Sequence, residues 1–161
     1  ISFLFLKLFI RKFSNKKFFY KEAILNSRGN VVNKRYKDRI IKVYDHSYNA
    51  SPYSLKKQII HFDNLKVTKK LCIIGSIKEL GNQTEKYHRA LLEDIKDLKV
   101  KRIIFIGEEF FNFRSSYKAY NFYKSYKNYI NVMKKDLEYG KNIFVMGSRL
   151  NNLDKVIQHI C

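Results

Sequence analysis

Three short apolar runs, each closed by a glycine, constrain the fold of this chain more than any other feature. They occupy residues 71–75, 103–107 and 143–147 and end in Gly75, Gly107 and Gly147. Unbroken runs of this length, rich in β-branched residues, are typical of strands that are covered on both faces, and a terminal glycine permits a tight exit turn. The runs therefore predict parallel strands at the centre of a sheet. Residues 39–44 predict a fourth strand, and residues 30–36 an edge strand beside it.

Helical patterns follow these strands. Ser51 is expected to cap a helix with Pro52 at its first position, and Asn82 and Glu85 have the spacing of a capping box. The expected buried stripes are Leu55, Ile59 and Phe62; Tyr87, Leu91, Ile95 and Leu98; Tyr126, Tyr129, Ile130, Met133 and Leu137; and Leu153, Val156, Ile157 and Ile160. Residues 110–124 lack a clear period and are expected to form a long loop or an irregular helix.

The alternation of strand and helix predicts an α/β fold, a Rossmann-like, doubly wound, mostly parallel sheet. In such sheets ligands collect at the carboxyl ends of the strands. The polar stretches directly after the predicted strands are therefore the expected site. They are residues 45–49, 76–81, 107–109 and 147–149.

The length of 161 residues suits one domain with a single core. Residues 1–26 are rich in Phe and Lys and do not follow the later rhythm, so we expect them to be the helical tail of a preceding domain, and residues 27–161 to be the main domain. The apolar opening at residues 1–10 meets Arg11 and Lys12 well before the ~20 residues that a membrane span requires. No membrane span is predicted.

The formal net charge of +19 admits two interpretations. One is a non-catalytic basic module that binds nucleic acid or an anionic surface. The other is a compositional bias that fills neutral surface positions with lysine, and we favour it because the lysines are spread along the whole chain. Nucleic acid is then not an expected partner. The cysteines, Cys72 and Cys161, have no neighbours at metal-binding spacing, and no metal site is predicted.

Four segments resemble motifs of the Mur ligase family, in the same order along the chain. Residues 45–52, DHSYNASP, resemble the signature DDSYNANP of the member that adds D-alanyl-D-alanine, and residues 75–81, GSIKELG, followed by His88, resemble its GDMxELG. Residues 27–29, SRG, resemble the GRG at a domain boundary, and residues 147–149, GSR, resemble part of KGSR. A single match of this kind is weak evidence, whereas four collinear matches across residues 27–161 are specific.

The resemblance implies the C-terminal domain of a cytoplasmic three-domain enzyme of peptidoglycan precursor synthesis. Such an enzyme uses ATP and Mg²⁺ to activate the carboxylate of a UDP-MurNAc-peptide, and the amine of D-alanyl-D-alanine then attacks. The sequence has no G-x-x-x-x-G-K-[ST] phosphate loop, which in this family belongs to the central domain. The resemblance therefore implies that the chain needs the N-terminal and central domains as partners and is inactive alone.

The resemblance also implies roles for single residues. Arg28 and Asp45 are the expected catalytic residues, and both are expected to contact the nucleotide. The other expected nucleotide contacts are His46, Asn49 and Ser51, and the expected substrate contacts are Glu79, His88, Ser148 and Arg149. Several of them have a purely structural alternative: Arg28 as a solvated boundary arginine, Asp45 as a turn or capping residue, Ser51 as a helix cap, Ser148 and Arg149 as helix-capping residues, and His88 as a helix-surface histidine.

Three positions depart from the family pattern. His46 replaces the second Asp of DDSYNANP, Ser76 replaces the Asp of GDMxELG, and Met146 replaces the Lys of KGSR. Each change removes a charge. A decayed remnant that folds without catalysing therefore stays open as an alternative to a working ligase domain.

Overall fold

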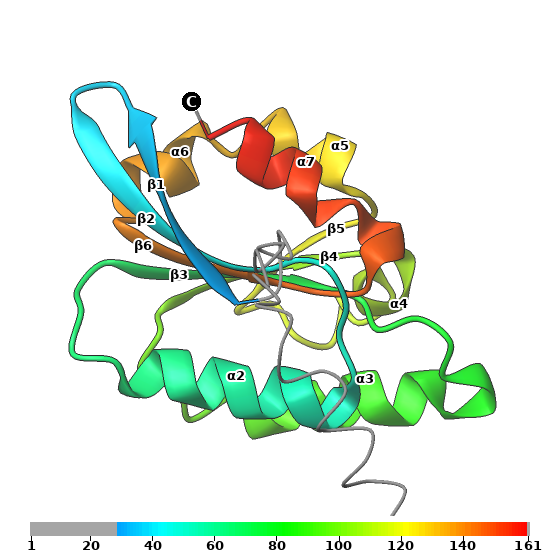
Figure 1. The fold of residues 1–161 in the computed structure, drawn as a ribbon. Helices are drawn as coiled ribbons and strands as arrows, with labels where there is room; N and C mark the ends of the chain where they lie inside the picture. The colour runs from blue at the N-terminus through cyan, green and yellow to red at the C-terminus, as the bar shows by residue number, and fades with distance from the viewer. Residues whose placement is uncertain (1–28, 161) are drawn as a thin grey trace, which may run out of the picture.

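The computed structural model describes residues 29–160 and shows a mixed sheet with helices on both faces (Figure 1). The strands are β1 (Asn30–Tyr36), β2 (Arg39–His46), β3 (Lys70–Gly75), β4 (Arg102–Ile106), β5 (Asn121–Tyr123) and β6 (Asn142–Met146). They lie in the order β1-β2-β6-β3-β4-β5. Only the β1–β2 pair is antiparallel. The predicted α/β class, the parallel central strands and the edge strand are confirmed.

Helices cover the two faces of the sheet unequally. The longer helices α2 (Pro52–Asn64) and α3 (Thr84–Asp94) lie on one face, and α5 (Tyr126–Ile130), α6 (Lys134–Tyr139) and α7 (Leu153–Gln158) lie on the other (Figure 1). The short helix α4 (Glu108–Phe111) and the 3-10 turns η1 (Gly81–Gln83) and η2 (Arg149–Asn151) follow strand ends. Among the residues that the structure describes, no helix is long and apolar enough to cross a bilayer.

The apolar core has two layers, one on each face of the sheet. Leu55, Ile59 and Phe62 of α2 pack in the first layer, as the stripe predicted. The second layer contains Val156 and Ile157 of α7. Each layer holds alternate side chains of the same strands, because successive residues of a strand point to opposite faces. Cys72 is a free, fully buried core residue, and burial raises the pKa of its thiol.

The start of α3 was predicted wrongly. Asn82 lies in η1 and does not cap a helix; α3 begins at Thr84, after the uncapped Gln83. Leu91 and Ile95 of the predicted stripe are buried, and Leu98 is partly buried against the core, as expected. His88 and Leu92, which were not in the stripe, are buried as well. Tyr87, expected to be buried, is 39% exposed.

Two further elements differ from the prediction. Residues 110–124 contain the last two residues of α4 and the strand β5, which pairs in parallel with β4. A three-residue strand at a sheet edge carries no apolar run to reveal it. The single helix expected over residues 126–137 is two short helices separated at residues 131–133. Tyr129, Met133 and Leu137 are all buried at helical spacing, which explains why the pattern suggested one helix.

Residues 1–28 and Cys161 lie outside the described residues. They include the predicted helical tail at residues 1–26 and Arg28.

Candidate functional site

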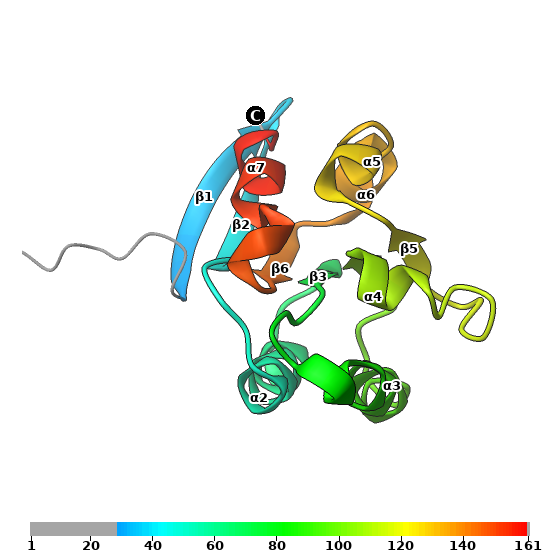
Figure 2. The ribbon, with the colours of Figure 1, turned by 90° about the vertical axis from the view of Figure 1, so that its right-hand side faces the viewer.

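The carboxyl ends of β2, β6, β3 and β4 meet at one edge of the sheet, which Figure 2 views end-on. We call it the carboxyl edge. Two glycines allow the strand ends to approach closely. A Cβ on Gly147 would lie 2.7 Å from the Cα of Gly75, and a Cβ on Gly107 would lie 2.2 Å from Ser76 Oγ. Gly107 also has a φ of +125°, which side-chain-bearing residues rarely adopt. The glycine-terminated runs are therefore required by the packing of this edge.

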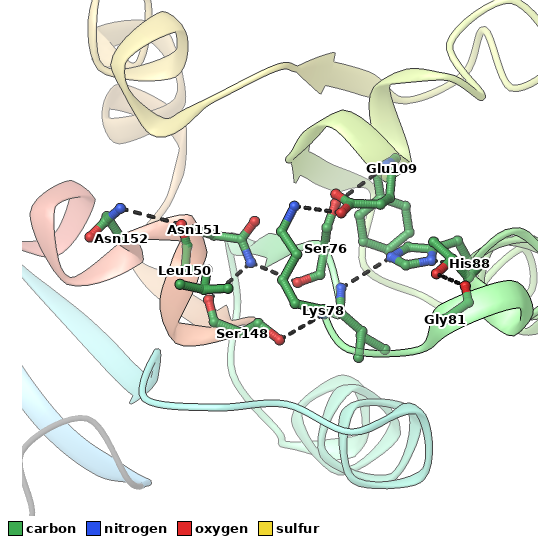
Figure 3. A network of polar contacts seen from close by, with 12 residues as sticks. Ser76, Lys78, Gly81, His88, Glu109, Ser148, Leu150, Asn151 and Asn152 are labelled. Carbon is green, nitrogen blue, oxygen red and sulfur yellow. Dashed lines mark hydrogen bonds and ion pairs between the residues drawn. The ribbon is translucent and has the colours of Figure 1, made fainter.

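A network of buried hydrogen bonds joins the loops that follow β3 and β6 (Figure 3). The Nδ2 group of Asn151 donates to the carbonyl of Ser76 at 2.6 Å and to the carbonyl of Ser148 at 2.9 Å. Ser76 N–H donates to the carbonyl of Ile106 at 2.8 Å, and Phe110 N–H donates to Ser76 Oγ at 3.3 Å. Asn151 and Ser76 are both buried, so these bonds hold polar groups that water does not reach.

His88 anchors the loop after β3 from below. Its Nε2 accepts from Ile77 N–H at 3.1 Å, so Nδ1 carries the proton and donates to the carbonyl of Thr84 at 2.7 Å. The imidazole is fully buried and packs edge-on against Phe110 with ring centroids 4.5 Å apart. Burial lowers the pKa of His88, against the opposing effect of the bond to Thr84. His88 is therefore not a helix-surface residue, and its two hydrogen bonds join the loop after β3 to the first turn of α3.

Lys78 and Glu109 form an ion pair in the centre of this edge. Lys78 Nζ lies 2.5 Å from Glu109 Oε1, and both side chains are mostly buried. Lys78 N–H also donates to Ser148 Oγ at 2.9 Å, which ties the β3 loop to the β6 loop. Burial raises the pKa of Glu109, but the hydrogen bonds from Lys78 and from its own backbone outweigh burial, so the pKa is lowered. Glu109 is therefore a carboxylate at neutral pH.

The residues after β2 serve the local structure. Asp45 is 8% exposed and its Oδ1 accepts from Ser47 N–H at 2.9 Å, the turn role that was the alternative for this residue. Asn49 Oδ1 accepts from Ala50 N–H at 2.8 Å. Ser51 caps α2 as predicted: its hydroxyl accepts from Ser54 N–H at 3.2 Å in a capping box.

Arg149 connects the β6 loop to the β2 loop. It is exposed, and its guanidinium lies 5.2 Å from the centroid of the Tyr48 ring. Glu79 is also exposed, on a left-handed backbone with a φ of +65°. These two side chains face solvent at the edge where Ser148 and Lys78 are buried or half-buried. The structure thus brings Ser148, Arg149 and the loop of Glu79 together around Lys78.

Three contributors to this edge were not among the predicted site residues. Lys78 and Glu109 lie in the polar stretches after β3 and β4, which were expected to form the site. Their position directly after a strand could therefore have identified them. Asn151 had no signal, because η2 separates β6 from α7 where a helix was expected to follow at once. Within residues 29–160 no cluster of three or more His, Cys, Asp or Glu side chains is arranged to hold a metal ion.

The three departures from the family pattern have defined surroundings. Ser76 is fully buried in the hydrogen-bond network and Met146 is 3% exposed in the core. His46 is half-buried, packs against Phe144 with ring centroids 5.3 Å apart, and has its pKa lowered mainly by burial. The alternation along β2 directs Asp45 and His46 to opposite faces of the sheet. The carboxylate of Asp45 therefore cannot take the position of the family's second Asp, which His46 replaces in this chain.

Comparison with known proteins places this architecture in a family. Residues 27–149 match the model of the Mur ligase glutamate ligase domain, and the chain belongs to the Mur ligase family of ATP-dependent ligases. It is 31% identical over 122 residues to the UDP-N-acetylmuramoyl-tripeptide–D-alanyl-D-alanine ligase of Borreliella burgdorferi, covering 71% of this chain and 26% of that protein. It is 27% identical over 140 residues to the enzyme of the same name from Rickettsia prowazekii, covering 85% and 30%.

Solved structures support the fold. The MurF ligase of Thermotoga maritima, determined in complex with ADP, superimposes with a TM-score of 0.62 at 20% identity, covering 84% of this chain and 30% of that one. A MurF of Acinetobacter baumannii superimposes with a TM-score of 0.66 at 18% identity, covering 84% and 30%. The chain thus spans about a third or less of the length of these relatives.

Proposed function

We propose that residues 27–161 are the C-terminal domain of a ligase that adds D-alanyl-D-alanine to a UDP-MurNAc-tripeptide, with residues 1–26 as the tail of the preceding domain. The observation that carries the proposal is the 31% identity to the Borreliella burgdorferi ligase over 122 residues. The four collinear motifs support it, because three of them lie at the carboxyl edge, where doubly wound sheets bind ligands. As a family of cytoplasmic enzymes, Mur ligases suggest the cytoplasm as the site of action.

The described residues do not form a complete site for ATP and Mg²⁺. At the carboxyl edge, Asp45 accepts a hydrogen bond from its own turn and Glu109 pairs with Lys78, and the described residues contain no cluster of three or more His, Cys, Asp or Glu side chains that could hold a metal ion. The phosphate loop is absent from the sequence. We therefore assign the nucleotide to the partner domains and give this domain the closing face of the site, with Arg28, which lies outside the described residues, as its candidate phosphate contact.

The exposed part of the carboxyl edge suits the incoming dipeptide. Arg149 offers an always-charged planar donor to a carboxylate, and Tyr48 packs beside it. The pair Lys78–Glu109 and the buried Asn151 hold the two loops that carry Arg149 and Glu79. Pre-organised loops of this kind lose less entropy on binding than mobile ones. In this scheme His88, Asn151 and the buried Ser148 are positioning residues, and the exposed Arg149 and Glu79 contact substrate.

A chimera tests the proposal. Residues 27–161 replace the C-terminal domain of the Borreliella burgdorferi ligase, and phosphate release from ATP is measured with UDP-MurNAc-tripeptide, with and without D-alanyl-D-alanine. We expect turnover that depends on the dipeptide. The 161-residue chain alone and the truncated relative alone are the controls, and both should be inactive. A folded chimera without activity, or turnover by the chain alone, would contradict the proposal.

The role of position 46 is tested in the same chimera. His46→Asp restores the family charge, and we expect it to raise turnover if this position contacts the nucleotide. Asp45→Asn is the matched variant on the other face of β2 and should leave the KM for ATP unchanged. An inactive chimera that gains activity from His46→Asp would identify the natural chain as a decayed remnant.

A further inference from the structure

Five exposed lysines lie in the loops that enter three neighbouring strands, at the edge of the sheet opposite the candidate site. We call them the amino-edge lysines; they are Lys66, Lys69, Lys99, Lys101 and Lys141. Figure 1 shows the loops that lead into β3, β4 and β6 on the side of the sheet away from the loops that follow these strands. The lysines are dispersed in sequence, and the fold gathers them.

The strand register sets how close their backbones are. Lys141 N–H donates to the carbonyl of Lys69 at 2.9 Å, which places these two residues side by side. Leu71 pairs with Arg102, so Lys101 lies beside Lys70 one strand further along. Neighbouring strands are about 4.8 Å apart, so the entries of β6, β3 and β4 fall within about 10 Å.

These cations are not neutralised by the fold. Within residues 29–160 none of the amino-edge lysines takes part in an ion pair, whereas nearby Lys37 pairs with Glu138. Asp63, the buried carboxylate beneath these loops, accepts from the backbone N–H groups of Lys99 and Val100 and not from a lysine side chain. Asp97 is the exposed carboxylate in the loop that carries Lys99. The edge therefore keeps an excess of positive charge.

One of these lysines occupies an unfavourable backbone conformation. Lys69 has a φ of +50°, where glycine or asparagine is less strained. Lys37 and Glu79 also have left-handed backbones, so this conformation is not peculiar to the amino-edge lysines. Asparagine tolerates it better than lysine does, so Lys69→Asn removes the cation without adding strain.

We propose that the amino-edge lysines bind the surface of an anionic lipid bilayer. Lysine is a point charge suited to a diffuse layer of phosphate headgroups, at about a fivefold gain in affinity per residue. Nucleic-acid binders add a helix for a groove or exposed aromatic rings for stacking. The exposed tyrosines of the described chain, Tyr53 and Tyr87, belong to α2 and α3 and not to these loops. Ile40, 49% exposed near the turn between β1 and β2, gives this end of the sheet an apolar contact for the headgroup region.

The test uses the full chain and vesicles of phosphatidylcholine with 30% phosphatidylglycerol. The edge variant carries Lys69→Asn, Lys101→Gln and Lys141→Gln, in which asparagine suits the left-handed turn. We expect its affinity for the anionic vesicles to fall on the order of a hundredfold. Binding of the unchanged chain should weaken steeply with salt and be absent with pure phosphatidylcholine.

A matched variant separates the edge from the net charge. Lys57→Gln, Lys86→Gln and Lys127→Gln remove three exposed helical lysines that form no ion pair within the described residues. We expect this variant to lose less than about threefold in affinity. Equal losses in both variants would overturn the proposal, because the whole charge would then act. Edge-dependent binding to double-stranded DNA or RNA without binding to vesicles would overturn it as well. Failure here leaves the chimera result untouched, since the ligase proposal concerns the opposite edge.

Discussion

The two edges of the sheet differ in how their polar groups are used. At the carboxyl edge Ser76, His88 and Asn151 are buried and every one of them is hydrogen-bonded to another loop. At the amino edge the lysines are exposed and unpaired within the described residues. A buried polar group that loses its partner destabilises the fold, whereas an exposed charge contributes little. The structure should therefore depend on the carboxyl edge and tolerate changes at the amino edge.

The largest effect is expected at Gly107. Gly107→Ala places a Cβ 2.2 Å from Ser76 Oγ on a backbone with a φ of +125°, and should lower the free energy of unfolding by about 3 kcal/mol or more. Gly81→Ala is the control: its φ is +53°, but nothing lies within 4 Å, so only the backbone cost of about 1 kcal/mol applies. Urea unfolding of both variants measures the difference. Equal losses would show that the close approach at the carboxyl edge is unimportant.

The next largest effect is expected at Asn151. Asn151→Ala leaves the carbonyls of Ser76 and Ser148 without this donor and should cost about 2 kcal/mol. Asn33→Ala, at an exposed position of β1, should stay within about 0.5 kcal/mol. Denaturant midpoints of the two variants, at equal slopes, make the comparison. A loss at Asn33 as large as that at Asn151 would remove the distinction between buried and exposed asparagines.

A smaller, pH-dependent effect is expected at His88. Its folded pKa lies below the unfolded value of about 6.5, so the unfolded state binds the proton more tightly. The stabilising contribution of neutral His88 is present above pH 6.5 and is lost as the pH falls below that value. His88→Gln removes this titration while Glu109 and Lys78, the charged groups whose fields act on the imidazole, remain. Unfolding free energies of both proteins between pH 7.5 and 5 should converge as the pH falls; a constant gap would contradict the assignment.

The smallest effect is expected at the amino edge. The variant with Lys69→Asn, Lys101→Gln and Lys141→Gln should keep its free energy of unfolding within about 0.5 kcal/mol, because these side chains form no ion pair among the described residues. Urea unfolding in low salt is the most sensitive measurement. A loss above about 1 kcal/mol would mean that the lysines support the fold, and the contrast between the two edges would fail.

Much of the fold could be predicted because its signals are local. The apolar runs and their glycines identified β3, β4 and β6, and the Ser51-Pro52 start of α2 was predicted to the residue. The start of α3 and the strand β5 could not be predicted in the same way. Asn82 is a common capping residue but lies in a 3-10 turn that precedes the helix, and a short edge strand depends on its neighbour more than on its own residues.

The sequence predicted where the candidate site lies, but it did not predict the hydrogen-bond partners of the residues in it. The polar stretches after each strand were expected at one edge, and the structure confirms that they meet there. The turn role of Asp45 and the buried, loop-holding role of His88 emerged only when their hydrogen bonds were visible. The Asp45 carboxylate and the His88 imidazole can each bond several backbone groups, and sequence spacing does not choose among them.

The sequence alone determined the class of fold, the family and the glycine positions where two backbones approach closely. It could do so because strand, helix-cap and glycine patterns each depend on a few residues that are adjacent in the chain. What required the tertiary structure is the pairing of distant groups. Lys78 meets Ser148 across 70 positions and Glu109 across 31, and Lys69 comes to lie beside Lys141. Contacts of that kind follow from strand order, and strand order is a property of the assembled sheet.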